Sequence, residues 1–553
     1  MADAQVVAAT DAASAPAAGN SMVDAWPDPR EDGDDAYRES FDSIDRASNE
    51  TDEGASLCHG WCPDQYLELV DCERKGLDRL KTAFQIENCA AATDPGHLKD
   101  VESKILKVAD STVFTFFRGA AAFFDYNMMC EDKNFTLKKL TMPRVYSNGD
   151  CHPENFGTMV QASNNVEKRT TTGDLVWGVN DFDQSFLTPF SWDLKRGAVG
   201  FALGIKDRGW ALMDVSRVSY SFIDAYINTI MERQHCSFLN DERFVEGSAY
   251  VANNATLIKS LFQKARKRDE TKETKNWLEK KMAIDTENDR FVKDEDRGIF
   301  PLPDEVLPEF QASVDAWLYH GVAALAKYPN VGDFYKVLSV AEKKGSGTGS
   351  IGLKRYYILI DGRYDDPNGY IVLEMKQEVN SVLEVFFHYT YTKSQEGKRA
   401  VNSMRNAWPY AALFYGWTTY QGDAYIIREK SKHAVSIDIN ELSKDEYVAY
   451  ARHSGRALAF YHIRVRCPNF QCKLEAQSAV DLEICHNIQD YLMGYGVEAF
   501  KNMVFRFASK EYVRQNNAFE LLNRFVEHRI KHNSSPLDIL VGEKKPSSCR
   551  GLA

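Results

Sequence analysis

Most of the chain is predicted to be helical, because apolar residues recur at the spacing of one helix face. The predicted helices cover residues 67–84, 98–128, 191–206, 314–326 and 446–464. Within 191–206, Ser191 is the expected N-cap, and the apolar residues between Leu194 and Ile205 gather on one side. That segment is therefore expected to face the core.

Strand-like sequence begins at Phe334 and ends near Lys430. Runs of β-branched and aromatic residues alternate there with turns built from Gly, Asp, Pro and Asn. The runs cover residues 334–343, 353–362, 370–378 and 423–430. They predict a small antiparallel sheet, after which helices resume.

Shorter strands flank a polar segment earlier in the chain. A strand over 144–146 runs into the sequence SNGDCHPENFG, and the runs 157–161 and 174–180 are joined by a polar loop. Such a pair predicts a β-hairpin, which would return residue 181 to the side of residue 155.

These elements predict an α+β protein of two lobes, since 553 residues exceed what one core usually organises. The first residues are rich in Ala, Ser and acids and are expected to be disordered. The predicted units are a leader at 1–55, a large helical lobe at 56–333, a small β lobe at 334–430, helices completing the large lobe at 431–540 and a loose tail at 541–553.

The composition favours a small-molecule or protein partner. The chain is 44% hydrophobic and 12% aromatic, and its formal net charge is −13. Nucleic acids and anionic membranes attract basic faces, so neither is expected as a partner. The sequence does not indicate the oligomeric state.

A cytoplasmic, reduced location is expected. The chain lacks a basic segment followed by an apolar run at its start and has no apolar stretch near eighteen residues. Its eleven cysteines are scattered without a repeated spacing, which indicates no disulfide framework.

Two acidic clusters predict a magnesium site. Asp150 is followed five residues later by Asn155, and Asp181 and Asp183 flank Phe182. An acid can orient a hydroxyl, while carboxylate and amide oxygens suit a hard Mg²⁺ ion that bridges phosphates. Either cluster alone is equally typical of a structural turn, but the predicted hairpin brings the two together.

A glycine-rich segment predicts phosphate contacts. The pattern G-x-G-x-x-G includes Gly347, Gly349, Ser350 and Gly352, and a strand follows it. A Rossmann turn would open a helix, so the segment is predicted to lie in a β-hairpin, as in kinases. Lys376 on a later strand is expected to contact phosphates, although an edge-strand lysine that limits aggregation is the structural alternative.

Several further residues are weaker candidates for the site, and each has a structural as well as a functional interpretation. Arg118 is a candidate for phosphate binding or for an ion pair inside the large lobe. His152 is a candidate acid or base, or a residue that binds the loop backbone. Glu378 and Glu384 are alternative partners for Lys376. The group Cys58, His59 and Cys62 lacks the second pair that a structural zinc site needs.

The motifs resemble known families. GDCHPEN, NDFD and WDLKR are similar to the catalytic half of aminoglycoside and choline phosphotransferases, whose fold is that of the protein kinases. A wider set resembles the domain-of-unknown-function 2252 family across about residues 60–500. That set is FFRG, GDCHPENFG, NDFDQ, WDLKR, GTGSIG, EMKQE and YIIRE.

The resemblance implies a protein-kinase-like fold that is circularly permuted. Kinases place the glycine loop and lysine before the catalytic aspartate, whereas this chain has them after it. In the phosphotransferases a helix ending in Leu-Ala-x-x-His precedes the catalytic loop, and here Leu458–His462 follows the sheet. The cyclic order would then be preserved, with the cut between that helix and the loop.

The resemblance also implies roles for individual residues. Asp150 would be the catalytic aspartate, Asn155 and Asp181 would bind the metal, and Asp193 would brace the catalytic loop. Asp183 replaces the glycine of the kinase Asp-Phe-Gly motif, so it is a further metal candidate.

The expected function is transfer of the γ-phosphoryl group from ATP, with Mg²⁺, to a hydroxyl of a small molecule or protein. Two alternatives stay open. One is nucleotidyl (AMP) transfer on the same fold, and the other is a catalytically silent ATP-binding scaffold. No local pattern identifies the acceptor.

Overall fold

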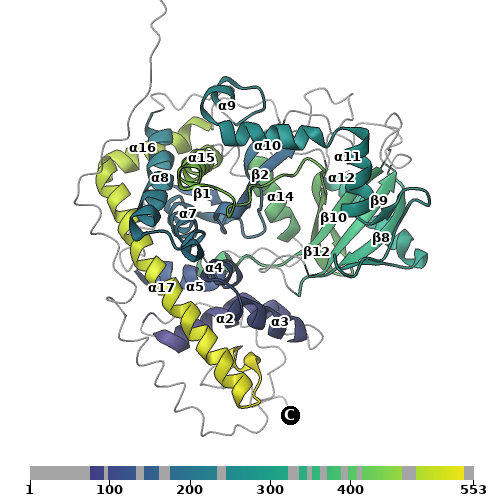
Figure 1. Cartoon of the computed structure of the whole chain (residues 1–553), viewed down its shortest axis with the longest axis horizontal. Helices are drawn as coiled ribbons and strands as arrows, with labels where there is room; N and C mark the ends of the chain where they lie inside the picture. Colours follow the sequence, from purple (N-terminus) through teal and green to yellow (C-terminus); the bar gives the residue numbers. More distant parts are fainter. Residues whose placement is uncertain are drawn as a thin grey trace, which may run out of the picture.

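The structure is a computed structural model of the whole chain, and its helices and strands form a mainly helical part beside a β-sheet (Figure 1). The described residues are 72, 75–92, 98–131, 142–160, 175–232, 244–321, 335–345, 352–361, 370–387, 396–407, 414–463 and 481–540. The predicted leader, the loose tail and the group Cys58, His59 and Cys62 lie outside them.

The helical part is built around one large apolar core and a smaller second one, which contains Leu80, Val101 and Ile105. Its helices are α2 (Gly76–Ala92), α3 (Leu98–Ala109), α4 (Val113–Gly119), α5 (Ala121–Glu131), α7 (Ser191–Leu203), α8 (Leu212–Met231), α9 (Ala249–Asn254), α10 (Thr256–Lys267), α11 (Thr271–Asn276), α15 (Lys444–Ile463), α16 (Asp481–Tyr495) and α17 (Val497–Lys531). Helices α7, α8 and α15 contribute buried residues to the same core cluster, together with α17. Residues distant in sequence therefore form one hydrophobic unit.

Helix α7 is central to this unit. All thirteen of its residues are buried, so the prediction that it faces the core with only one side was too narrow. The prediction of Ser191 as N-cap was wrong: the cap is Phe190, and the Ser191 hydroxyl lies 3.2 Å from the Met142 sulfur. A helix surrounded by protein has its start set by tertiary packing instead of a side-chain cap.

Two short antiparallel pairs lie beside α7. Strand β1 (Arg144–Ser147) pairs with β4 (Phe186–Pro189). Strand β2 (Phe156–Val160) pairs with β3 (Leu175–Val179), with Phe156 opposite Val179. This second pair confirms the predicted hairpin, and the Asn180 amide reaches the Asn155 carbonyl at 3.3 Å.

A six-stranded antiparallel sheet forms the other part, at the right of Figure 1. Its order is β11 (Tyr415–Tyr420), β12 (Asp423–Glu429), β10 (Tyr370–Glu378), β9 (Arg355–Asp361), β8 (Val337–Lys343) and β7 (Ile299–Pro301). The α+β class is thus confirmed. Strand β7 lies upstream of the range 334–430 from which the sheet was expected to come.

Each face of this sheet is covered by a different segment. Helix α12 (Leu307–Gly321) contributes Phe310, Val314 and Trp317 to one apolar cluster with the sheet. The short hairpin of β5 (Ile284–Asp285) and β6 (Arg290–Phe291) contributes to a second cluster with Tyr357, Leu359 and Val372. Helices α13 (Val382–Phe387) and α14 (Glu396–Ala407) connect the sheet to the helical part.

One cysteine prediction was wrong. Cys72 and Cys130 form a disulfide that links the segment before α2 to α5. They are 58 residues apart, so no local spacing marks them as a pair. Among the described residues, no helix is both long and apolar enough to cross a membrane.

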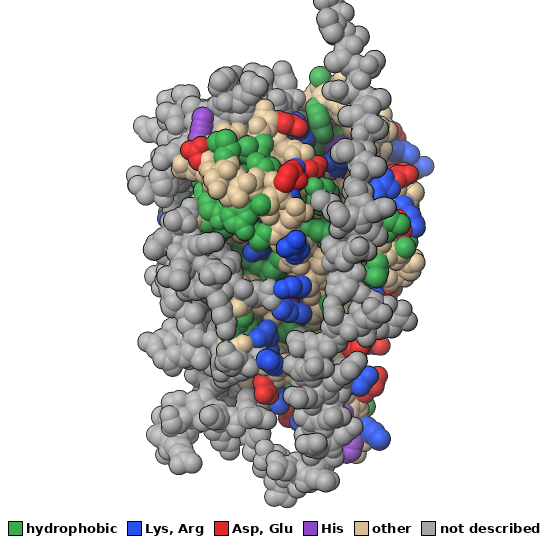
Figure 2. Space-filling view, turned by 90° about the vertical axis from the view of Figure 1, so that its left-hand side faces the viewer, with side chains coloured by type: hydrophobic (Ala, Val, Ile, Leu, Met, Phe, Trp, Pro, Cys, Tyr) green, Lys and Arg blue, Asp and Glu red, His purple; other side chains and the backbone are tan. Residues whose placement is uncertain are grey.

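Charge is not distributed evenly over the surface. Figure 2 looks onto the side where α17 runs along the molecule, and Lys and Arg side chains form a row there next to an apolar area. The exposed residues of α17 include Arg506, Lys510 and Arg524. Local basic regions therefore exist on a chain whose net charge is −13.

Candidate active site

The loop between β1 and β2 is held by a buried aspartate on α7. Asp193 accepts hydrogen bonds from the backbone amides of Asn148 and Gly149, the latter at 2.9 Å. His462, near the end of α15, places its Nε2 3.1 Å from the same carboxylate. Asp193 thus braces the loop, as the resemblance implies.

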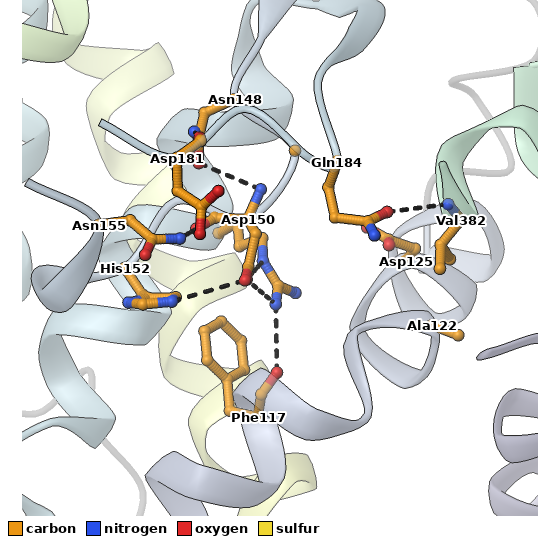
Figure 3. Close-up of polar contacts among 12 residues, drawn as sticks. Phe117, Ala122, Asp125, Asn148, Asp150, His152, Asn155, Asp181, Gln184 and Val382 are labelled. Atoms are coloured by element: carbon orange, nitrogen blue, oxygen red, sulfur yellow. Dashed lines mark hydrogen bonds and ion pairs between the residues drawn. The ribbon is translucent and has the colours of Figure 1, made fainter. Parts of the chain in front are cut away.

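Gly149 allows the close approach of two loops. Its φ is +80°, and a Cβ there would lie 2.1 Å from the backbone oxygen of Gln184. Only glycine combines that conformation with that contact. The Gln184 side chain in turn accepts a hydrogen bond from the Val382 amide at 2.9 Å, which ties the acidic loop to α13 (Figure 3).

Asp150 lies in a strong ion pair. Its Oδ1 accepts from Arg196 Nε at 3.0 Å and Nη2 at 2.6 Å, and Arg196 also donates to the Phe117 carbonyl at 3.1 Å. Burial alone would raise the pKa of Asp150, but the Arg196 guanidinium and His152 keep that pKa well below its usual range. Asp150 is therefore a carboxylate that stays ionised.

His152 binds the loop backbone. Its Nδ1 accepts from the Glu154 amide at 3.2 Å, and its Nε2 lies 3.5 Å from Asp150 Oδ2. Burial lowers the pKa of His152, while Asp150 acts against this shift. The geometry fits the backbone role, which was one of its two predicted interpretations.

Asn155 and Asp181 come together with Asp150 (Figure 3). The Asn155 amide donates to the Asp150 carbonyl at 2.9 Å, and the Asn148 amide donates to the Asp181 carbonyl. The Asp181 Oδ1 is buried and has no hydrogen-bond partner in the described part of the chain. A buried carboxylate oxygen without a donor is costly unless a cation or water meets it.

Lys376 joins the sheet to the acidic loop. Its ammonium forms an ion pair with the Asp183 carboxylate, and its side chain is buried. The Asp183 Oδ1, like that of Asp181, is buried without a hydrogen-bond partner among the residues that the structure describes. The predicted lysine and the predicted acids therefore meet, although they are far apart in the sequence.

Neither predicted glutamate forms the ion pair with Lys376. Glu378 is buried, and burial raises its pKa to about 7, although Lys376 and Arg399 oppose the shift. Burial and the neighbouring Glu396 raise the pKa of Glu384 to about 8. Glu384 instead accepts a hydrogen bond from the Asn380 side chain at 2.7 Å, whereas Glu378 Oε1 is buried without a hydrogen-bond partner among the described residues.

Part of the glycine-rich segment lies outside the described residues. Gly347, Gly349 and Ser350 belong to that part, and their predicted phosphate contacts stay predictions. Gly352 is described, and its φ of +89° is in the region that favours glycine. The flanking strands β8 and β9 pair antiparallel, so the segment does connect two strands of a hairpin.

Most of the chain matches the model of one protein family. Residues 99–524 match the family model described as "Uncharacterized protein conserved in bacteria (DUF2252)". The chain belongs to this family. No curated protein and no solved structure matches it. In this DUF2252 member, Asp150, Asp181, Asp193 and Lys376 all fall inside the matched range.

Arg399 is a site residue that sequence reasoning missed. This buried arginine of α14 donates to the backbone oxygens of Ser185 at 2.7 Å, Asp183 at 2.8 Å and Val379 at 3.1 Å. Its Nε bonds Glu396 at 2.8 Å. No motif surrounds Arg399, so only the contacts across more than 200 residues identify it.

Arg118 forms the ion pair that was one of its two predicted roles, and its phosphate binding stays a prediction. Its guanidinium forms an ion pair with Glu154 and lies 5.5 Å from the centre of the Phe114 ring. Glu154 is part of the same loop as Asp150. Arg118 therefore supports the outer side of that loop.

Proposed function

We propose that this DUF2252 protein is an ATP- and Mg²⁺-dependent phosphotransferase with a kinase-like active site. The main support is the meeting of Lys376 with the acidic loop, where two buried carboxylate oxygens, of Asp181 and Asp183, lack a partner among the described residues. A cation and a phosphate chain would satisfy these groups together.

The residues fit a magnesium ion when an amide and phosphate oxygens complete its ligands. Among the described residues, no group of three or more His, Cys, Asp or Glu side chains is arranged for a metal. Asn155 and Asp181 would hold Mg²⁺, which usually keeps few protein ligands and takes the rest from water and phosphate. Bound Mg²⁺ would neutralise charge on the transferred phosphoryl group.

Asp150 would orient the acceptor hydroxyl. Its lowered pKa makes it a weak base, so its contribution would be alignment of the hydroxyl more than storage of a proton. Arg196 fixes Oδ1 of Asp150, and Oδ2, which lies 3.5 Å from His152 Nε2, would meet the acceptor. Positioning and charge carry most of phosphoryl transfer, so such a role is sufficient.

The order of elements supports a circularly permuted kinase-like fold as part of the proposal. The sheet with Lys376 follows the acidic loops in sequence, and α15 with His462 follows the sheet. The contact of His462 with Asp193 puts the end of α15 against the loop of Asp150. In the phosphotransferases that this chain resembles, the corresponding helix leads directly into that loop.

The test is an assay of the full chain with ATP and Mg²⁺. Asp181→Asn removes a metal-ligand charge, so hydrolysis or transfer should fall by roughly 100-fold or more. Asp445→Asn, an exposed acid on α15, is the matched control and should keep full activity. Equal activity of wild type and Asp181→Asn would contradict the metal role, and mass spectrometry of the product distinguishes phosphoryl from nucleotidyl transfer.

A further inference from the structure

Three residues of α15 form a group that the proposed active site does not use. Arg452 is exposed, His453 is buried and Arg456 is half-buried. Residues three and four positions apart are neighbours on a helix, so Arg456 lies beside both of the others. Helix α15 lies next to α8 (Figure 1), and Tyr250 of α9 contacts the group. We call Arg452, His453 and Arg456 the Arg456 group.

The Arg456 guanidinium is held between two aromatic rings. Its Cζ lies 4.5 Å from the centre of the Tyr250 ring and 5.1 Å from that of the Phe460 ring. Such stacking fixes the plane of the guanidinium and the directions of its donors. The Nε of Arg456 is buried and has no hydrogen-bond partner among the described residues. A buried donor without an acceptor indicates that an acceptor belongs there.

His453 provides a second, independent observation. Its side chain is 7% exposed, and its Nδ1 is buried without a hydrogen-bond partner in the described part of the chain. Its ring contacts those of Phe244 and Tyr250 edge to face, at 5.6 Å and 6.3 Å between centres. Burial lowers the pKa of His453 to about 4, and the charges of Arg452 and Arg456 contribute to this shift. Tyr250 therefore borders both a stacked arginine and a neutral histidine, each with an open polar atom.

The neighbouring acids do not cancel the charge of both arginines. Glu232, the C-cap of α8, acts on the Tyr250 hydroxyl in the opposite sense to the two arginines. Glu246 is engaged elsewhere, because both of its oxygens accept from Arg266 Nε, at 3.1 Å and 2.9 Å. No other acid in the described part of the chain acts on His453 or Tyr250. Glu232 thus offsets at most one of the two positive charges.

The arrangement of donors suits a phosphate group. Arg452 and Arg456 are one helical turn apart, which places their Cβ atoms about 6 Å from each other. Two guanidinium groups at this spacing can reach different oxygens of one tetrahedral anion, whereas a single fork already saturates a carboxylate. The Nδ1 of His453 can bind a further oxygen of the same anion, either as donor or as acceptor.

We propose that the Arg456 group is a phosphate-binding site, separate from the proposed nucleotide site at Lys376. The ligand is inorganic phosphate or the phosphate group of a small phosphomonoester. The proposal does not depend on the proposed function, because it uses none of the residues placed in the active site.

Calorimetric titration of the full chain with inorganic phosphate at pH 7.5 tests this site. Wild type should bind, and Arg456→Met should weaken binding about tenfold, which corresponds to about 1.4 kcal/mol. Arg452→Met should weaken binding similarly, and the exposure of Arg452 makes a folding defect in this variant unexpected. Arg217→Met is the matched control, because Arg217 is an exposed arginine of α8 that pairs with Asp445 at the start of α15. This control should bind as wild type does.

A parallel titration with glycerol phosphate distinguishes the two sources of the ligand. Tighter binding of the ester would identify a phosphomonoester, and equal or weaker binding would identify free phosphate. In either case Arg452→Met and Arg456→Met should bind the preferred probe less tightly than Arg217→Met does.

Nuclear magnetic resonance of His453 gives a readout that a purely structural role would not change. Its imidazole signal is identified by its loss in His453→Gln. An anion beside the ring favours the charged form, so phosphate should raise the pKa of His453 by about one unit, and by less in Arg452→Met. Absence of phosphate binding in wild type would overturn the proposal. Equal binding in wild type, Arg452→Met and Arg456→Met would also overturn it, since phosphate would then bind elsewhere, as would an unchanged His453 pKa.

Discussion

Glu378 is the residue whose ionisation should be visible in stability. Burial raises its pKa to about 7, Lys376 and Arg399 act against the shift, and Asp181 adds to it. In the unfolded chain the same group titrates near 4.5. The folded protein therefore binds more protons between these values, and stability should fall as pH rises through that window.

Glu378→Gln should remove this loss of stability with rising pH. Without Mg²⁺, the variant should be more stable than wild type at pH 8, by about 3 kcal/mol for a shift of this size. At pH 4 the two proteins should be nearly equal, because the glutamate is then protonated in both states. Urea unfolding at the two pH values measures the difference, and Asp445→Asn serves as the control. A variant less stable than wild type at pH 8 would show that the ionised Glu378 is stabilising.

Individual site residues were predictable when a local pattern marked them. Asp150 and Asp181 follow the short strands β1 and β3, and Asn155 precedes β2. The hairpin of β2 and β3 could be predicted, so the meeting of these residues could be as well. Arg399 and the Cys72–Cys130 disulfide could not be, because each depends on partners distant in sequence. Residue spacing could not predict the partner of Lys376 either. Asp183, an acid of another loop, pairs with Lys376 in place of both candidate glutamates.

Among the elements, α14 has the most specific task. Its Arg399 donates to three backbone oxygens, at Asp183, Ser185 and Val379, and so fixes the acidic loop against the end of β10. A guanidinium can do this because its donors form a rigid fork. The helix thus positions the acidic loop.

Arg399→Met should destabilise the protein by about 3 kcal/mol or more, since it leaves buried carbonyls and Glu396 without their donor. Arg399→Lys should not restore stability, because one ammonium cannot reach three separate oxygens. Lys398→Met, at the exposed neighbouring position of the same helix, should have little effect. Thermal and urea unfolding measure this. Full rescue by lysine would show that only the charge matters.

The strands were the most predictable elements. Strands β8, β9, β10 and β12 lie within the predicted runs, because β-branched and aromatic residues between turns leave few alternatives. Strands β7 and β11 were not predicted, since short segments join a sheet through their partners more than through their own sequence. Helix α7 shows the same limit, because its start depends on packing.

At the scale of the whole molecule, the account depends on contacts between two parts of the chain. Lys376 comes from the sheet, Asp183 from the loop after β3, and Ser381 next to α13 donates to the Gln184 carbonyl at 2.8 Å. These contacts bring a sheet and an acidic loop to one place. A ligand that binds there should stabilise both parts together.

Hydrogen–deuterium exchange of the full chain with and without ATP and Mg²⁺ tests this claim most directly. The account predicts slower exchange in three separate segments at once, residues 148–156, 180–185 and 371–378, and no change in α10. Slower exchange in only one of the three segments, or in none of them at saturating nucleotide, would contradict a shared site.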